Sequence, residues 1–83
     1  MQNINVNQLM DNLEDLRKSG YKVTTIKQYY SRWFNDYIAY NHATHDCYIL
    51  KYVTNIKDGL MYHDGYTLKH YNKIPQKYYE YTW

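Results

Sequence analysis

Four side chains that could bind a metal or act in catalysis lie within the stretch 42–47, which reads His-Ala-Thr-His-Asp-Cys. Imidazole, carboxylate and thiolate groups are ligands for zinc and copper, and His63 or His70 could complete a tetrahedral set. The spacing matches none of the usual paired-ligand patterns, and a histidine-rich loop beside a helix is a common feature of proteins without metals. We therefore expect a solvated loop with a half-buried Cys47, and no metal or other cofactor.

The same stretch places a histidine close to the single cysteine of the chain, which is the combination that activates a thiolate nucleophile. His45 and Cys47 are two positions apart and need not meet, and no neighbouring pattern predicts a pocket that would orient them. The three glycines, Gly20, Gly59 and Gly65, fall in separate turns and form no phosphate-binding loop. The sequence therefore predicts that the protein is not an enzyme.

Basic side chains form the other pattern with chemical meaning. The net charge is only +2, but three acids precede position 16, and the stretch 17–32 then contains five basic residues and no acid. A smaller basic group, Lys69, Lys73 and Lys77, lies near the C-terminus. Such stripes bind phosphate groups in some proteins and are solvated helix surfaces in others. The charge pattern taken alone favours the solvated surface.

The elements that would position these residues are predicted from the spacing of apolar side chains. The stretch 6–19 carries one apolar stripe at helical spacing, formed by Val6, Leu9, Met10, Leu13 and Leu16. Asn5 is a suitable residue to cap the start of this helix, and Gly20 suits its end. A first helix over residues 6–19 is therefore expected.

Three further helices are expected over residues 23–41, 46–57 and 66–74, followed by a short helical turn after Pro75. In 23–41 the aromatic residues repeat at helical spacing, with Trp33 and Phe34 as the expected main core anchors. The predicted fold class is all-α, a small four-helix domain that spans residues 1–83 as a single unit.

Composition limits the setting in which the chain works. Thirteen tyrosines accompany only two tryptophans and one phenylalanine, which reflects either AT-rich codon usage or a recognition surface. One cysteine permits no intrachain disulfide, no apolar run approaches the roughly 20 residues that span a bilayer, and the N-terminus lacks the pattern of a signal peptide. We therefore expect a cytoplasmic protein that does not cross a membrane.

The order of these features resembles a known domain. A Leu-x-x-Leu pair, a Gly-Tyr pair, a Thr-Ile-x-x-Tyr segment and an aromatic pair follow one another at Leu13, Leu16, Gly20, Tyr21, Thr25, Ile26, Tyr29, Trp33 and Phe34. This pattern is similar to the N-terminal core-binding (SAM-like) domain of tyrosine recombinases, the phage and transposon integrases. The catalytic half of that family has no counterpart in this chain. The resemblance therefore implies a DNA-clamping module without the chemistry.

In the recombinase family this domain lies across duplex DNA and contacts phosphates with the start of its second helix and part of its last helix. Carried over to this sequence, the implied DNA-binding residues are Lys22, Thr24, Thr25, Lys27, Gln28, Arg32, Lys69, Lys73 and Lys77. The leading expectation is therefore non-catalytic binding of duplex DNA. The alternative is a small phage or mobile-element protein that binds and modulates a host protein through a tyrosine-rich surface. A structural or homo-oligomeric role also remains open.

Overall fold

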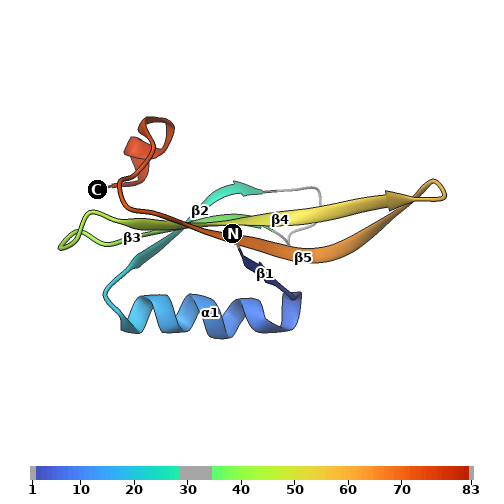
Figure 1. Ribbon diagram of the computed structural model, residues 1–83, viewed down its shortest axis with the longest axis horizontal. Coiled ribbons are helices and arrows are strands. Elements are labelled where there is room, and N and C mark those ends of the chain that lie inside the picture. The colour runs from blue at the N-terminus through green and yellow to red at the C-terminus, as the bar shows by residue number, and fades with distance from the viewer. Residues whose placement is uncertain (1, 29–34, 83) are drawn as a thin grey trace.

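The computed structural model describes residues 2–28 and 35–82. The elements along the chain are β1 (Gln2–Ile4), α1 (Val6–Lys18), β2 (Lys22–Gln28), β3 (Asn35–Tyr40), β4 (Cys47–Lys57), β5 (Leu60–Tyr71) and the 3-10 helix η1 (Gln76–Tyr81). Figure 1 shows the sheet with α1 below it and the C-terminal segment above it. The described part of the chain is thus one sheet with a helical element on each side.

The five described strands form one antiparallel sheet in the order β1-β5-β4-β3-β2. β1 and β2 are the two edges, and α1 connects them by running across one face of the sheet (Figure 1). A bulge between Thr25 and Lys27 interrupts the pairing of β2 with β3. Bulges and lysines on an edge discourage pairing with another chain, so β2 is a protected edge.

The core on the α1 side begins with a well-capped helix. The Asn5 side chain accepts a hydrogen bond from the Gln8 amide at 2.9 Å, and the Gln8 side chain accepts one from the Asn5 amide at 3.0 Å. This reciprocal arrangement satisfies two amides that the first turn leaves without helical partners. The apolar stripe of α1 then packs on the sheet in a cluster of Ile4, Leu9, Leu13, Leu50, Tyr52 and Tyr66.

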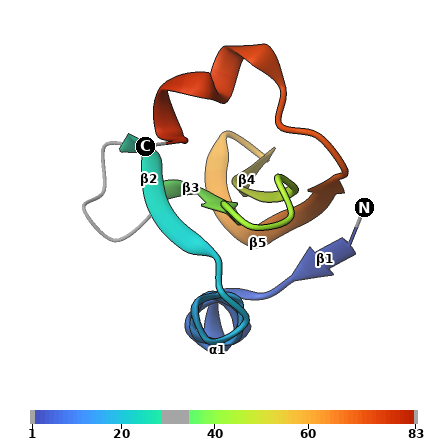
Figure 2. The same cartoon turned by 90° about the vertical axis from the view of Figure 1, so that its left-hand side faces the viewer.

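A second core lies on the opposite face of the sheet, under η1. Figure 2 shows α1 and the C-terminal segment on opposite sides of the strands. This cluster contains Ile38, Tyr40, Cys47, Ile49, Ile74 and Tyr78. Because the side chains of a strand alternate between faces, neighbours such as Ile49 and Leu50 on β4 enter different cores. Both faces of the sheet centre are therefore buried.

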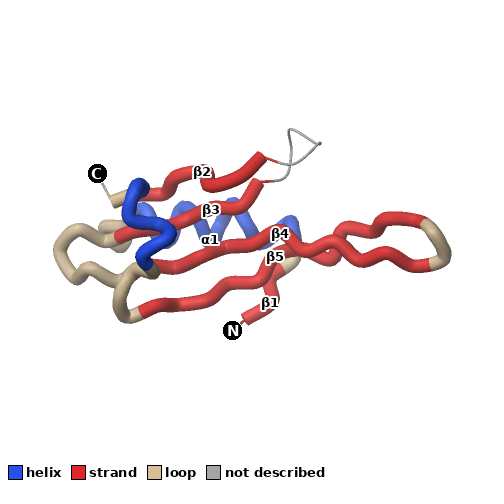
Figure 3. Tube along the Cα trace, turned by 90° about the horizontal axis from the view of Figure 1, so that it is seen from above, coloured by secondary structure: helices blue, strands red, loops and turns tan. Residues whose placement is uncertain are grey.

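The hairpin of β4 and β5 extends beyond the rest of the sheet, as Figure 3 shows. β4 pairs with β5 from Cys47 to Lys57, whereas β3 covers only residues 47–50 of β4 and β1 covers only residues 66–68 of β5. Asp58 and Gly59 form the two-residue turn with φ values of 53° and 76°. Positive φ at both positions is the geometry that suits the twist of a two-stranded ribbon.

The prediction of an all-α four-helix domain is wrong. The predicted helix 23–41 is replaced by β2 and β3, the helix 46–57 by β4, and the helix 66–74 by β5 with the turn that follows it. Trp33 and Phe34, the expected core anchors, lie outside the described residues. Only the first predicted helix and the turn after Pro75 correspond to observed elements, α1 and η1.

The physical reason is that apolar residues in these stretches fill two faces of a sheet. Ile49 and Leu50 are adjacent and both buried, which fits a strand covered on both sides as well as one stripe of a helix. The four-helix fold implied by the resemblance to the recombinase domain is accordingly not the fold of this chain. Among the described residues, no helix is long and apolar enough to cross a membrane.

Candidate functional site

The η1 side of the molecule carries a group of exposed lysines, which we call the lysine face. Cross-strand partners share a face of the sheet, so Lys22 opposite Tyr40 and Lys69 opposite Ile49 lie on the side of the η1 core. Lys51 follows Ile49 by two positions on β4 and lies on the same side. The lysine face consists of Lys22, Lys51, Lys69, Lys73 and Lys77, all of them exposed.

Aromatic rings support part of this surface. The Lys69 ammonium lies 5.0 Å from the centre of the Tyr71 ring, and the Lys77 ammonium lies 5.0 Å from that of Tyr78. Lys51 and Lys69 are diagonal neighbours in the antiparallel pairing, a geometry that separates residues by about 7–8 Å. Like charges held this close repel each other, and an anionic partner would remove that cost.

The α1 side has a different charge. Asp11, Glu14 and Asp15 are exposed on α1, where they outnumber the basic residues Arg17 and Lys18. Lys18 forms a salt bridge of 3.3 Å with Glu14, and both side chains are exposed. Exposed pairs of this kind contribute little to stability. The two sides of the sheet therefore differ in the sign of their surface charge.

The residues expected to bind DNA at the start of a second helix instead belong to strand β2. Thr24 lies opposite Ile38 on the η1 side, whereas Thr25 lies opposite Tyr37, which packs against the α1 core. The strand thus separates two hydroxyls that a helix start would have grouped at one phosphate. The backbone of Lys27 and Gln28 is in β2, and Arg32 lies outside the described residues.

The structure brings the other expected residues together on one side. Lys22 on β2, Lys69 on β5, Lys73 in the following turn and Lys77 on η1 all belong to the lysine face. Sequence reasoning missed Lys51, because a helix over 46–57 gave it no relation to Lys69. In a strand, residues 49, 51 and 53 lie on the same face of the sheet, and this alternation is the signal that would have placed Lys51 on the lysine face.

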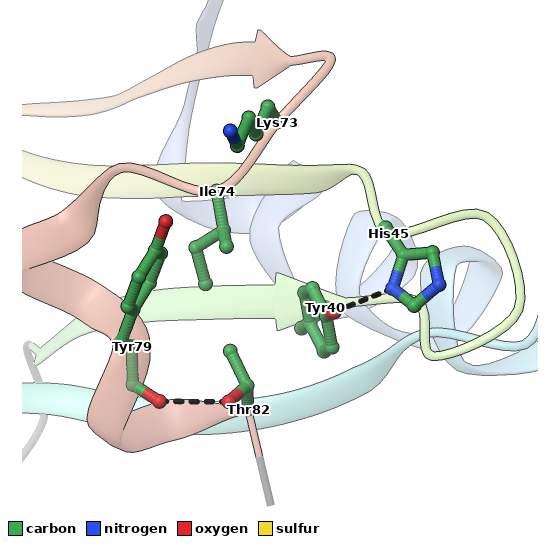
Figure 4. A pocket seen from close by; sticks show the side chains of 6 residues that line it. All are labelled: Tyr40, His45, Lys73, Ile74, Tyr79 and Thr82. Atoms are coloured by element: carbon green, nitrogen blue, oxygen red, sulfur yellow. Dashed lines mark hydrogen bonds between the residues drawn. The ribbon is translucent and has the colours of Figure 1, made fainter.

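A cavity of about 330 Å³ opens beside the lysine face, between η1 and the turn that follows β3. Its lining residues are Tyr40, His45, Lys73, Ile74, Tyr79 and Thr82. Figure 4 shows Tyr79 and His45 at opposite ends with Ile74 between them. His45 Nδ1 lies 3.0 Å from the Tyr40 hydroxyl, and the Thr82 hydroxyl donates to the Tyr79 carbonyl at 2.7 Å. These contacts fix both ends of the cavity.

A second hollow, of about 440 Å³, runs along α1 on the other side of the sheet. Asn12, Asp15, Ser19, Tyr21 and Tyr48 are among its lining residues. Asp15 makes this hollow a poor place for an anionic ligand. The cavity beside the lysine face is therefore the better candidate for a phosphate-bearing group.

The stretch 42–47 forms a hydrogen-bonded turn around Asp46. One carboxylate oxygen accepts hydrogen bonds from the Tyr21 hydroxyl at 2.5 Å and from His70 Nε2 at 2.7 Å, and the other oxygen accepts one from Thr44. Burial by itself would raise the pKa of Asp46, but these three donors outweigh it and lower the pKa to about 2. Burial, together with the hydrogen bond to Asp46, raises the pKa of Tyr21 to about 12.

Among the side chains that the structure describes, which exclude His63, no group of three or more histidine, cysteine, aspartate or glutamate residues is arranged to hold a metal ion. His45 contacts Tyr40, while Asp46 points to His70 and Tyr21. Cys47 is fully buried, and burial followed by the charge of Asp46 raises the pKa of its thiol to about 11. At neutral pH this thiol stays protonated, which is unfavourable for a nucleophile or a metal ligand.

The expected tyrosine-rich surface is described only in part. Tyr79 is 49% exposed at the edge of the cavity, whereas Tyr66 and Tyr78 are buried in the two cores. Of the tyrosines whose side chains the structure describes, Tyr79 alone is exposed, and four are buried: Tyr40, Tyr52, Tyr66 and Tyr78. Comparison of the chain with family models, with curated proteins and with solved structures finds no match.

Proposed function

We propose that this protein binds duplex DNA, without chemistry of its own, by setting the lysine face against the phosphate backbone. The observation that carries the proposal is the grouping of five exposed lysines from three strands, a turn and η1 on one side of the sheet. Lysines that neutralise phosphates release condensed counterions, which drives binding without any base-specific contact. The acids on α1 face away from the DNA in this arrangement and do not repel it.

An acidic host protein is the second candidate partner. Tyr79 is half-exposed next to Lys73, and tyrosines beside basic side chains often anchor protein interfaces. The two partners differ in how binding responds to salt. Binding through phosphates weakens linearly on a log–log plot, with a slope of about −0.9 for each phosphate neutralised. A docked protein interface with a buried aromatic anchor depends on salt less steeply.

The test compares two double variants that remove the same charge from opposite sides of the sheet. Lys51→Ala with Lys69→Ala removes the two diagonal neighbours of the lysine face, and Arg17→Ala with Lys18→Ala is the matched control on α1. Each double variant lowers the net charge by two, so a difference between them reports position rather than total charge.

The measurement is fluorescence anisotropy on a mixed-sequence duplex between about 50 and 200 mM salt. Three to five phosphate contacts give the wild type a slope of roughly −3 to −4.5, and the Lys51/Lys69 variant should lose about 1.8 of it. The α1 variant should keep both the slope and most of the affinity. Equal losses in both variants, or negligible wild-type binding near physiological salt, would remove duplex DNA as the partner.

A further inference from the structure

The cavity beside the lysine face brings an exposed aromatic ring, an apolar side chain and an ammonium group together around one hollow. Tyr79 offers a half-exposed aromatic ring and Ile74 an apolar floor, while Lys73 supplies an ammonium group. Figure 4 shows these three side chains around one hollow. A ring suits the flat face of a nucleobase, and an ammonium suits a phosphate.

The size of the cavity limits what can enter it. Pockets for small ligands have volumes of about 300–1,000 Å³, and a cavity of about 330 Å³ lies at the lower end. That volume suits a single nucleotide better than a longer segment of a strand. The bases of an intact duplex are stacked and paired, so only an unpaired nucleotide could place its base there.

We propose that this cavity holds one unpaired nucleotide of the bound DNA, with its base against Tyr79 and its phosphate at Lys73. The protein then prefers DNA with a single-stranded end or gap over blunt duplex. The inference rests on the proposed function, because the lysine face would hold the adjoining duplex. Lys73 belongs to both surfaces and marks the place where the duplex would give way to the unpaired nucleotide.

The experiment compares a blunt duplex with the same duplex carrying a four-thymidine overhang, both at one fixed salt concentration. Stacking of one base on an aromatic side chain corresponds to roughly 5- to 150-fold in affinity. Wild-type protein should therefore bind the overhang substrate at least about fivefold more tightly. Tyr79→Ala should abolish this preference and leave the affinity for blunt duplex unchanged, whereas Tyr79→Phe keeps the ring and should retain the preference.

Equal affinity of the wild type for both substrates, or equal weakening of both by Tyr79→Ala, would overturn the inference. The mononucleotide dTMP, titrated alone and followed by NMR, separates this outcome from failure of the duplex proposal. Saturable dTMP binding that Tyr79→Ala abolishes would support the cavity site even if blunt duplex does not bind. No saturation with dTMP together with no overhang preference would sink the cavity site, whatever the duplex does.

Discussion

At the scale of single residues, Asp46 connects parts of the chain that are far apart in sequence. Its carboxylate accepts hydrogen bonds from Tyr21, which follows α1, and from His70, near the end of β5. His45, the preceding residue, has a left-handed φ of 64° and contacts Tyr40 on the cavity side. One turn therefore fixes a polar network on one side of the sheet and an end of the cavity on the other.

The low pKa of Asp46 predicts how stability depends on pH. The pKa is about 2 in the folded protein and about 4 in an unfolded chain, so the ionised network stabilises the fold above pH 4. This contribution is lost as the pH falls from about 4 towards 2. Asp46→Asn should cost about 1–2 kcal/mol at pH 7 and flatten the acid limb of the stability curve.

Urea unfolding between pH 2 and pH 7 measures this effect, with Tyr21→Phe as the matched control. That variant removes one donor and keeps the carboxylate charge, so it should lose about 1 kcal/mol and retain a sloping acid limb. The same acid limb in Asp46→Asn and wild type would show that other carboxyl groups control acid unfolding.

At the scale of elements, the sequence predicts α1 well because its signals are local. A capping residue, a single apolar stripe and a terminal glycine all lie within residues 5–20, and the observed helix is Val6–Lys18. Gly20 takes the expected positive φ of 98°. A helix whose capping residues and apolar stripe agree in this way can be predicted from its own residues, without knowledge of the rest of the fold.

Apolar spacing predicts helices where the strands lie, because the signals that favour a strand are weaker and partly non-local. Val23, Thr24, Thr25 and Ile26 form a β-branched run that favours a strand, although two of these residues also suit a helix start. Asp58-Gly59 between apolar runs is the strongest short hairpin signal, although the same pair also suits the end of a helix. That β1 pairs with β5, more than 60 positions away, follows from no local pattern.

The sequence predicts some residues of the lysine face, but not that they lie together on one surface. Lys69, Lys73 and Lys77 stand at a spacing of four, so a helix or a strand-and-turn would both group them. Lys22 joins them only through the pairing of β2 with β3, and Lys51 only through the register of β4. The cavity needs η1 to fold back over β3, which sequence spacing does not reveal.

Gly65 on β5 gives a prediction about how the β1 edge joins the sheet. Its φ is 108°, and a Cβ at this position would overlap the backbone carbonyl of Ile4. Gly65→Ala should therefore destabilise the protein by about 2–4 kcal/mol, through backbone strain and displacement of β1. Gly59→Ala is the matched control, because its φ of 76° is also positive, but a Cβ added there meets no described heavy atom within 4 Å apart from its chain neighbours.

Thermal unfolding measures both glycine variants. Gly59→Ala should cost no more than about 1–2 kcal/mol, since strain is its only penalty and the hairpin tip extends beyond β1 and β3. Similar midpoints for the two variants would mean that the close approach of β1 to Gly65 contributes nothing to stability.

At the scale of the whole molecule, one sheet separates two small cores, and each side has its own surface. The α1 side is covered along the helix and carries the acids, whereas the short η1 covers only part of the other face. The uncovered part of that face holds Lys51 and Lys69. Because η1 is too short to cover all of the strands beneath it, Lys51 and Lys69 stay exposed and are part of the proposed DNA surface.

A chain of 83 residues has a small free energy of unfolding, so we expect the two cores to unfold together. Leu50 and Ile49 are adjacent on β4, are 0% and 3% exposed, and enter the α1 core and the η1 core respectively. Leu50→Ala and Ile49→Ala should each cost about 2–5 kcal/mol. At about 4–8 °C per kcal/mol, each should lower the thermal midpoint by roughly 10 °C or more.

The measurement is thermal unfolding followed by circular dichroism in two wavelength ranges. The far-UV signal follows the sheet and α1, and the near-UV signal follows tyrosine packing in both cores. Lys51→Ala on the same strand is the control and should leave the midpoint nearly unchanged, because its side chain is exposed. A single shared transition in every variant is the expected result. If Ile49→Ala instead loosened tyrosine packing while the far-UV midpoint stayed in place, η1 would be a separable cover. The cavity and the lysine face would then rest on an element that detaches without unfolding the sheet.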